Sequence, residues 1–419
     1  MKKFKNILWI PLTIIGSIFW GAILLMAAYM LPTGRIQNHV AESVNILVGE
    51  GDYHEWQPGD TTSRSDNYTD CIMLNSAMYD GAEGIVEKAM IVPRYRTDAA
   101  SVTQELSAIL ENISETDRLT YGRYWHGYLV LLKPLLEFLN LQELRWLNAF
   151  VGASLVMLIC IMMYKYFGSI KYAIAFLISV FFLNPMVLYT SLQYSTSYYV
   201  ILIECLMALS VGDHLRKKNK FGLLFLLSGI VVAYVDLLTY PVATLGMLLI
   251  LDMLMYQANT KAKILEMIQG TFLWGLGYAG MWSGKWALAN LLTDYNVMQD
   301  AMGSAAGRVG IGMNAMDAIR QNLFWTNYNS VKIIMLLILF MLVLLLLTKR
   351  IIIRIDWSMV VPLLIICCIP FVRYALLKNH SFVHSWFTYR ECVVLIMGIV
   401  TLVFSCFKRG EKIEYKDAK

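Results

Sequence analysis

The segment from Arg373 to Arg390 holds the densest group of side chains that could do chemistry. It contains Arg373, Lys378, His380, His384, Tyr389 and Arg390. Arginine and lysine supply charges and donors that match a phosphate or pyrophosphate. The two histidines stand four residues apart, a spacing that can hold a metal ion on one helix face. Because no third ligand is identifiable, the pattern favours an anionic headgroup. A divalent metal and a loop of ordinary solvated charges stay open as alternatives.

Carboxylates that could act as a general base lie far from this segment in the chain. Asp66 and Asp70 fall within Ser65–Asn75, and Asp70 directly precedes the apolar residues 71–74. Burial of that run would partly bury Asp70, raise its pKa and improve it as a base. The alternative is that Asp70 is the N-cap of a helix over Cys71–Met78.

Two acidic residues inside apolar segments also need an explanation. Asp236 stands near the end of one apolar segment. A functional role and a buried pairing with another polar group are equally reasonable for it. Glu204 lies near the middle of another, where a structural hydrogen bond is favoured over a proton path. An ionisable group inside a membrane segment costs at least ~2.5–3.5 kcal/mol at its centre, so such residues are seldom accidental.

The composition identifies the class of protein. Of the 419 residues, 58% are hydrophobic and 16% are charged, and the mean hydropathy is +0.55. Soluble domains carry about 25% charged residues. The apolar residues gather into runs of roughly 17–25, long enough to cross a ~30 Å hydrocarbon core. These features exclude soluble enzymes, nucleic-acid-binding modules, disordered chains and coiled coils. They predict an all-α polytopic membrane protein whose partner is the lipid bilayer, with no nucleic acid.

The apolar runs predict about ten transmembrane helices. The first is too long for the 7–15-residue core of a signal peptide, so we expect it to be retained. The predicted spans are Leu8–Leu31, Leu147–Phe167, Tyr172–Tyr189, Ser195–Val211, Phe221–Thr239, Val242–Tyr256, Ile264–Leu288, Val331–Thr348, Trp357–Leu377 and Trp386–Cys406.

The distribution of basic residues sets the expected orientation. With the N-terminus inside, the cytoplasmic segments hold 19 of the 35 lysines and arginines, as the positive-inside rule requires. We therefore expect a multi-pass plasma (cytoplasmic) membrane protein with both termini in the cytoplasm. Its parts are a first helix (residues 1–31), an extracytoplasmic loop subdomain (32–145), a nine-helix region (146–407) and a cytoplasmic tail (408–419).

The long polar segment between the first two spans should be folded. It contains 17 of the 30 acidic residues. Ser101 and Gln104 form a capping-box pattern ahead of an amphipathic helix. The stretch Tyr124–Leu139 is apolar but too short to span, with Trp125 and Tyr128 as side chains that favour a membrane interface. We expect a mixed subdomain that ends in an interfacial helix.

This order of elements resembles the GT-C class of membrane glycosyltransferases. The resemblance is to the branch of protein mannosyltransferases and lipid A aminoarabinose transferases. It rests on the short aromatic helix with Lys133-Pro134, the entry Arg145-Trp-Leu-Asn-Ala-Phe-Val-Gly-Ala into the second span, and Asn184-Pro185 with Leu192-Gln-Tyr-Ser195 further on. It covers roughly Leu8–Leu209, and its motifs are degenerate and largely apolar.

The resemblance implies a function and some site residues. It implies inverting sugar transfer from a polyprenyl-phosphate-linked donor to an extracytoplasmic glycan, lipid or protein acceptor. Arg123 and His126, within the resembling stretch, would join the donor-binding residues. The family places its acid soon after the first span, where this chain has Gln37 and Asn38. The remaining candidates are Asp70, then Asp66, Asp236 and Glu42. A lipid-linked glycan transporter or flippase, or a polysaccharide polymerase or ligase, are the alternatives.

The orientation can be tested directly. Cysteines introduced into residues 32–145 should react with a membrane-impermeant thiol reagent in intact cells, because the basic residues place this region outside. Labelling that requires permeabilised cells would overturn the orientation and every site assignment that depends on it.

Overall fold

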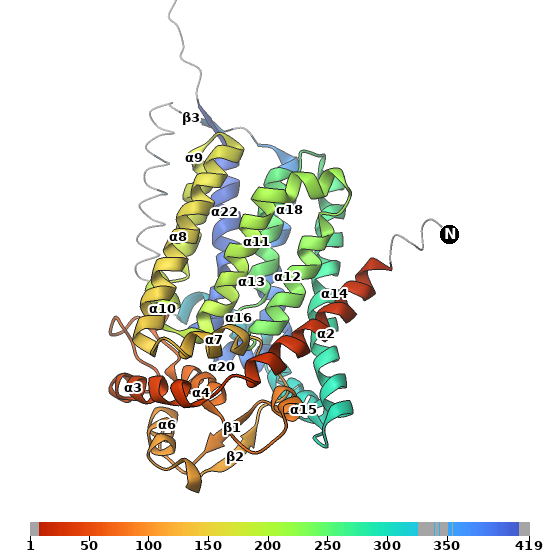
Figure 1. Ribbon diagram of the computed structural model, residues 1–419. Helices are drawn as coiled ribbons and strands as arrows, with labels where there is room; N and C mark the ends of the chain where they lie inside the picture. Colours follow the sequence, from red (N-terminus) through yellow and green to blue (C-terminus); the bar gives the residue numbers. More distant parts are fainter. Residues whose placement is uncertain (1–7, 326–338, 340–342, 344–350, 354, 410–419) are drawn as a thin grey trace, which may run out of the picture.

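The structure is a computed structural model that describes residues 8–325, 339, 343, 351–353 and 355–409 (Figure 1). The described part is helical almost throughout. The predicted span Val331–Thr348 lies outside the described residues, except for Leu339 and Val343. The main bundle consists of α2 (Trp9–Tyr29), α8 (Leu141–Phe167), α9 (Ile170–Phe182), α10 (Pro185–Thr190), α11 (Leu192–Lys217), α12 (Gly222–Val235), α13 (Val242–Met255), α14 (Thr260–Leu292), α18 (Trp357–Cys367), α19 (Ile369–Leu376) and α22 (Val393–Cys406).

Among the residues that the structure describes, five helical segments are long and apolar enough to cross a membrane. They are Trp9–Tyr29, Leu141–Phe167, Leu192–Lys217, Trp357–Leu376 and Ser385–Cys406. Three shorter apolar helices, α9, α12 and α13, pack among them. The large exposed side chains of α2 and α8 include Phe19, Trp20 and Phe150, which suit a lipid environment. The chain is thus an all-α membrane protein.

Prolines divide some of the predicted spans. Tyr172–Tyr189 is two helices, because α9 ends at Phe182 and Asn184 adopts a left-handed conformation (φ 58°) before Pro185 opens α10. Proline disfavours helical geometry in the residue before it and has no N–H to donate. Trp357–Leu377 is likewise two consecutive helices, α18 and α19, with Pro370 in the first turn of the second. Trp386–Cys406 begins with the short turns α21 (Ser385–Thr388) and η4 (Tyr389–Cys392).

A loop subdomain, residues 32–140, packs across one end of the bundle (Figure 1). Its elements are α3 (Gly34–Glu50), η1 (Thr61–Ser63), α4 (Asn67–Met78), α5 (Ile85–Ile91), β1 (Pro93–Arg96), α6 (Val102–Glu111), η2 (Ile113–Glu115), β2 (Asp117–Thr120) and α7 (Leu129–Leu136). Strands β1 and β2 pair antiparallel, with Pro93 opposite Thr120 and Arg96 opposite Asp117. The predicted cap is confirmed, since the Ser101 side chain accepts a hydrogen bond from the Gln104 N–H.

The predicted interfacial helix is shorter and more buried than expected. Only Leu129–Leu136 is helical, and Trp125 and Tyr128 are buried inside the protein rather than facing lipid. Trp125 Nε1 donates to the Met281 carbonyl at 2.6 Å and its ring packs on Tyr234. A tryptophan that favours a membrane interface can also satisfy its N–H inside a protein. Composition alone therefore does not distinguish an interfacial position from a buried one.

Buried cations attach the loop subdomain to the bundle. Arg145 on α8 forms a bidentate ion pair with Glu50 on α3, in which Nη1 and Nη2 donate to the two carboxylate oxygens at 2.6 and 2.8 Å. Lys285 on α14 donates to the Ala89 carbonyl at 2.8 Å, and Lys133 on α7 donates to the Ala77 carbonyl at 2.6 Å within the subdomain. Since unpaired charges are costly in a protein interior, these contacts hold the subdomain at a defined position over the helix ends.

Candidate functional site

A cleft of about 500 Å³ opens between the loop subdomain and the adjacent bundle end. The subdomain forms one wall. Helix α15 (Val297–Val309) and the turns α20 (Lys378–Val383) and α21 form the other. We call it the polar cleft, and it is lined by Tyr53, Asp66, Tyr68, Thr69, Tyr121, Arg123, Tyr124, Gln193, Leu237, Ser304, Gly307, Arg308, Asn379, His380, Val383, His384, Trp386 and Phe387.

Asp66 is the carboxylate in this cleft. It is the N-cap of α4, and its side chain accepts a hydrogen bond from the Thr69 N–H at 3.0 Å. Its side chain is only slightly exposed. Burial raises the pKa of the Asp66 carboxyl to about 6, against the opposing effect of the hydrogen bonds from Thr69. A carboxylate with a pKa this close to neutral can both take up and release a proton.

Two arginines supply positive charge to the cleft. Arg308, on α15, donates from Nη2 to the Tyr124 hydroxyl at 2.5 Å. The Arg123 guanidinium lies 4.6 Å from the centre of the Tyr121 ring, and its Nη1 is 3.3 Å from an Asp300 carboxylate oxygen. Each guanidinium has five N–H donors, so both retain donors for a ligand. Positive charge with spare donors suits a phosphate.

The predicted histidine pair is assembled in the same cleft. His380 lies in α20 and His384 directly follows it, and their ring centres are 4.9 Å apart. The Nδ1 atoms of both rings are buried without a hydrogen-bond partner. Burial and the nearby arginines lower the pKa of His384 to about 4 and that of His380 well below its usual value. Both rings are therefore neutral near pH 7, and each can donate or accept a hydrogen bond.

Aromatic side chains form the rest of the cleft surface. The Tyr53 and Tyr68 rings are stacked with centres 6.0 Å apart, and Tyr53 meets Trp386 edge to face at 5.5 Å. The Trp386 indole N–H and the Gln193 side-chain oxygen are buried without a partner. An unsatisfied buried polar group costs about 1–3 kcal/mol, so a ligand that supplied partners would be favoured here. Within the described residues, no group of three metal-binding side chains occurs.

Asp70, the first candidate for the catalytic base, is not among the residues that line the cleft. Helix α4 begins at Asn67 with Asp66 as its cap, so the alternative interpretation of Asp70 as the N-cap of a helix over Cys71–Met78 is wrong. The fully buried Asp70 carboxylate instead accepts hydrogen bonds from the N–H groups of Leu192 and Gln193, at 2.9 and 3.0 Å, and from the Ser191 hydroxyl at 3.2 Å. It thus caps α11, a helix more than a hundred residues away in the chain.

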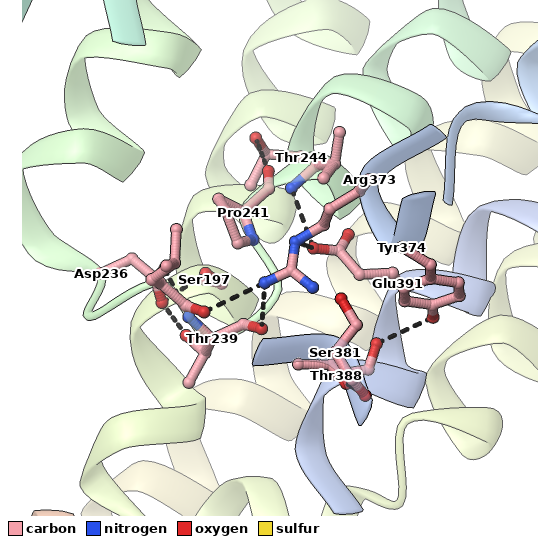
Figure 2. Close-up of polar contacts among 12 residues, drawn as sticks. Ser197, Asp236, Thr239, Pro241, Thr244, Arg373, Tyr374, Ser381, Thr388 and Glu391 are labelled. Carbon is pink, nitrogen blue, oxygen red and sulfur yellow. Dashed lines mark hydrogen bonds and ion pairs between the residues drawn. The ribbon is translucent and has the colours of Figure 1, made fainter. Parts of the chain in front are cut away.

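Asp236 and Arg373 belong to a buried network below the cleft, shown in Figure 2. Asp236 accepts hydrogen bonds from the Ser197 hydroxyl and from the Thr239 N–H, both at 2.9 Å. Arg373 donates to the carbonyls of Leu238 and Thr239 and lies 2.9 Å from a Glu391 oxygen. These contacts shape the turn after α12, whose Leu237 lines the cleft. Neither Asp236 nor Arg373 lines it.

The other predicted residues also lie outside the cleft lining. Arg390 is fully buried, donates to the carbonyls of Leu183, Trp386 and Thr62, and lies over the Tyr194 ring at 4.2 Å. Tyr389 is buried against Phe182. The His126 ring nitrogens are engaged by the Tyr128 hydroxyl and the Tyr121 carbonyl. Lys378 is half-buried, and Glu42 is exposed next to Asn140.

Sequence reasoning missed several of the lining residues. Arg308, Gln193 and Trp386 carry no local signal of a site, since each reaches the cleft only through long-range packing. For Arg308 the chain offers only a helix signal, the Asn296 cap of α15.

Comparisons with protein-family models, curated proteins and solved structures find no match to this chain. The functional argument therefore rests on the chemistry of the cleft itself.

The cap formed by Asp70 can be tested by Asp70→Asn. One amide oxygen can still accept, but the amide N–H₂ would face a backbone N–H, so we expect a loss of about 1–3 kcal/mol of stability. The midpoint of thermal unfolding in detergent measures it. Asp80→Asn, the same change at an exposed position, is the control and should leave the midpoint unchanged. Equal midpoints for the two variants would show that the cap contributes nothing.

Proposed function

We propose that this protein is a membrane glycosyltransferase that moves a sugar from a polyprenyl-phosphate-linked donor to an extracytoplasmic acceptor. The proposal includes ten transmembrane helices, a plasma-membrane location and both termini in the cytoplasm, as the basic residues indicate. The polar cleft then faces away from the cytoplasm, next to the membrane surface where a lipid-linked donor would present its headgroup.

One observation carries the proposal. The polar cleft brings a carboxylate of nearly neutral pKa, Asp66, together with two arginines and two neutral histidines from distant parts of the chain. Arg123 and Arg308 would bind the donor phosphate by charge-assisted hydrogen bonds. The stacked Tyr53 and Tyr68 rings offer flat apolar faces of the kind that pack against a sugar ring.

These residues suffice for a balanced transfer step. Asp66 takes the proton from an acceptor hydroxyl, and that oxygen attacks the anomeric carbon from the face opposite the phosphate. A new carbon–oxygen bond forms while the anomeric carbon–phosphate oxygen bond breaks, and its electron pair stays on the leaving phosphate. The arginines stabilise the negative charge that develops there. The configuration at the anomeric carbon is inverted.

The buried Glu204 supports this function over transport. It accepts a hydrogen bond from the Ser228 hydroxyl on the neighbouring helix α12 at 2.6 Å, which favours a helix-packing role. A polysaccharide polymerase or ligase would use the same class of donor and differs in its acceptor. No observation in the described residues favours that alternative.

The role of Asp66 can be tested by Asp66→Asn and by the pH dependence of transfer. A general base must be unprotonated, so wild-type activity should rise as the pH increases through about 6. Asp66→Asn should lower turnover by about 10²–10⁴-fold. The assay follows transfer from a panel of polyprenyl-phosphate sugars in isolated membranes.

A buried capping aspartate outside the cleft provides the control. Asp60 accepts a hydrogen bond from the Thr62 N–H and is as buried as Asp66. Asp60→Asn should retain transfer. Wild-type turnover in folded Asp66→Asn protein would remove Asp66 from the mechanism.

The phosphate-binding role of Arg308 gives a separate prediction. Arg308→Gln should weaken binding of a bare polyprenyl phosphate about tenfold to a hundredfold, as expected for one lost charge-assisted hydrogen bond. Binding is measured on detergent-solubilised protein. Arg320→Gln removes an exposed charge from α16 (Ala315–Arg320) and should have little effect. If both variants bind like the wild type, the cleft arginines do not contact the phosphate.

A further inference from the structure

A second cavity, of about 510 Å³, adjoins the polar cleft. The two cavities share Tyr68, Tyr121 and Arg123 as lining residues. We call the second one the side cavity. Its walls come from the β1–β2 ribbon, from the beginning of α15 and from the residues just before it. Both volumes fall in the range typical of small-molecule sites.

The side cavity presents a mixture of hydrogen-bond donors and acceptors. Arg94 and Arg123 offer N–H groups, Asp300 offers carboxylate oxygens, and Asn296 offers both kinds of group. The polar cleft likewise has one carboxylate, Asp66, beside two arginines, and it adds the two neutral histidines. An anion accepts hydrogen bonds but donates none, so it would match the arginines of the side cavity but could not donate to the oxygens of Asp300 or Asn296.

Arg94 is the strongest sign that a ligand binds here. Its residue is 7% exposed, and its Nη1 has no hydrogen-bond partner. The Glu105 carboxylate oxygen lies 3.6 Å from this nitrogen, beyond hydrogen-bond length. Because Arg94 lines the side cavity, this N–H can donate a hydrogen bond to an oxygen of a bound molecule.

We propose that the side cavity binds a neutral, hydroxyl-rich saccharide. A sugar hydroxyl both donates and accepts, so it matches walls that carry both kinds of group. Tyr68, Tyr121 and Tyr295 supply apolar ring faces for the carbon skeleton of the sugar. In a chain with the function proposed above, on which this role depends, the saccharide is the acceptor of the transferred sugar.

The boundary between the two cavities allows the saccharide to reach the reacting groups. The Arg123–Asp300 ion pair lies at this boundary, with side chains 24% and 50% exposed. A solvent-exposed ion pair at 3.3 Å is weak, so a ligand can displace it. Tyr68 lines both cavities two residues after Asp66. A hydroxyl that passes this boundary enters the cleft that contains the proposed base.

The experiment measures saccharide binding to the full-length protein in detergent by isothermal titration. The probes are glucose, galactose, mannose and N-acetylglucosamine, their disaccharides, and glucuronate as an anionic comparison. Arg94→Gln should weaken binding of the neutral sugars about tenfold, the effect of one or two lost hydrogen bonds. Arg96→Gln, on the same strand with an exposed side chain, should bind like the wild type.

A second variant tests the side cavity independently, in case Arg94→Gln fails to fold. Asn296→Asp keeps the oxygen that accepts from the Gln299 N–H at the start of α15 and removes the amide donors. It should also weaken saccharide binding. Asn314→Asp makes the same change at the exposed cap of α16 and should not.

The outcomes separate this inference from the proposed function. Absence of binding by every neutral sugar, binding unchanged in both Arg94→Gln and Asn296→Asp, or preference for glucuronate would each overturn the saccharide site. Arg94-dependent binding of a neutral sugar supports it. If that binding is found while Asp66→Asn retains full transfer, the saccharide site stands and the proposed mechanism fails.

Discussion

The carboxylate of Asp70 connects the two parts of the molecule on which the polar cleft depends. It lies in α4 of the loop subdomain and accepts two backbone N–H groups and a hydroxyl at the start of α11. The free N–H groups of a helix end need such partners, and a carboxylate there is also favoured by the helix dipole. Asp66 is the N-cap of the same helix α4, and Gln193 lies in the first turn of α11. The cap therefore sets the position of both residues in the cleft wall.

Other buried polar groups hold the opposite wall in place. Asn322 donates to the Ser381 carbonyl and accepts from the Thr388 hydroxyl, which fixes α20 and α21 relative to each other. Arg390 joins the Trp386 carbonyl in α21 to the Thr62 carbonyl in the loop subdomain. The ionisable residues thus divide into two groups. Arg390, Lys285 and Arg145 donate to protein groups away from the cleft, whereas Arg308 and Arg123 line it.

The two cavities share a wall, and each is lined by two arginines and one aspartate. Helix α15 runs along both, with Asp300 at the side cavity and Arg308 at the polar cleft. Residues three and four apart point to the same side of a helix, so a spacing of eight residues, two steps of four, keeps these two on one face. A single helix thus presents a carboxylate to one cavity and a guanidinium to the other. This arrangement suits two ligands of different chemistry that meet near Tyr68.

The amino-acid sequence by itself determined those features that depend on composition or on nearby residues. The membrane class follows from the apolar runs, the Ser101 cap from a four-residue pattern, and the His380–His384 pair from its spacing. The tertiary structure decided that Asp66 and Arg308 line the polar cleft whereas Asp70 and Arg390 do not. The two members of each pair carry the same charged group. What separates them is whether the N–H groups and carbonyls of distant segments reach the charged group, and that depends on the packing of the loop subdomain against α11 and α21.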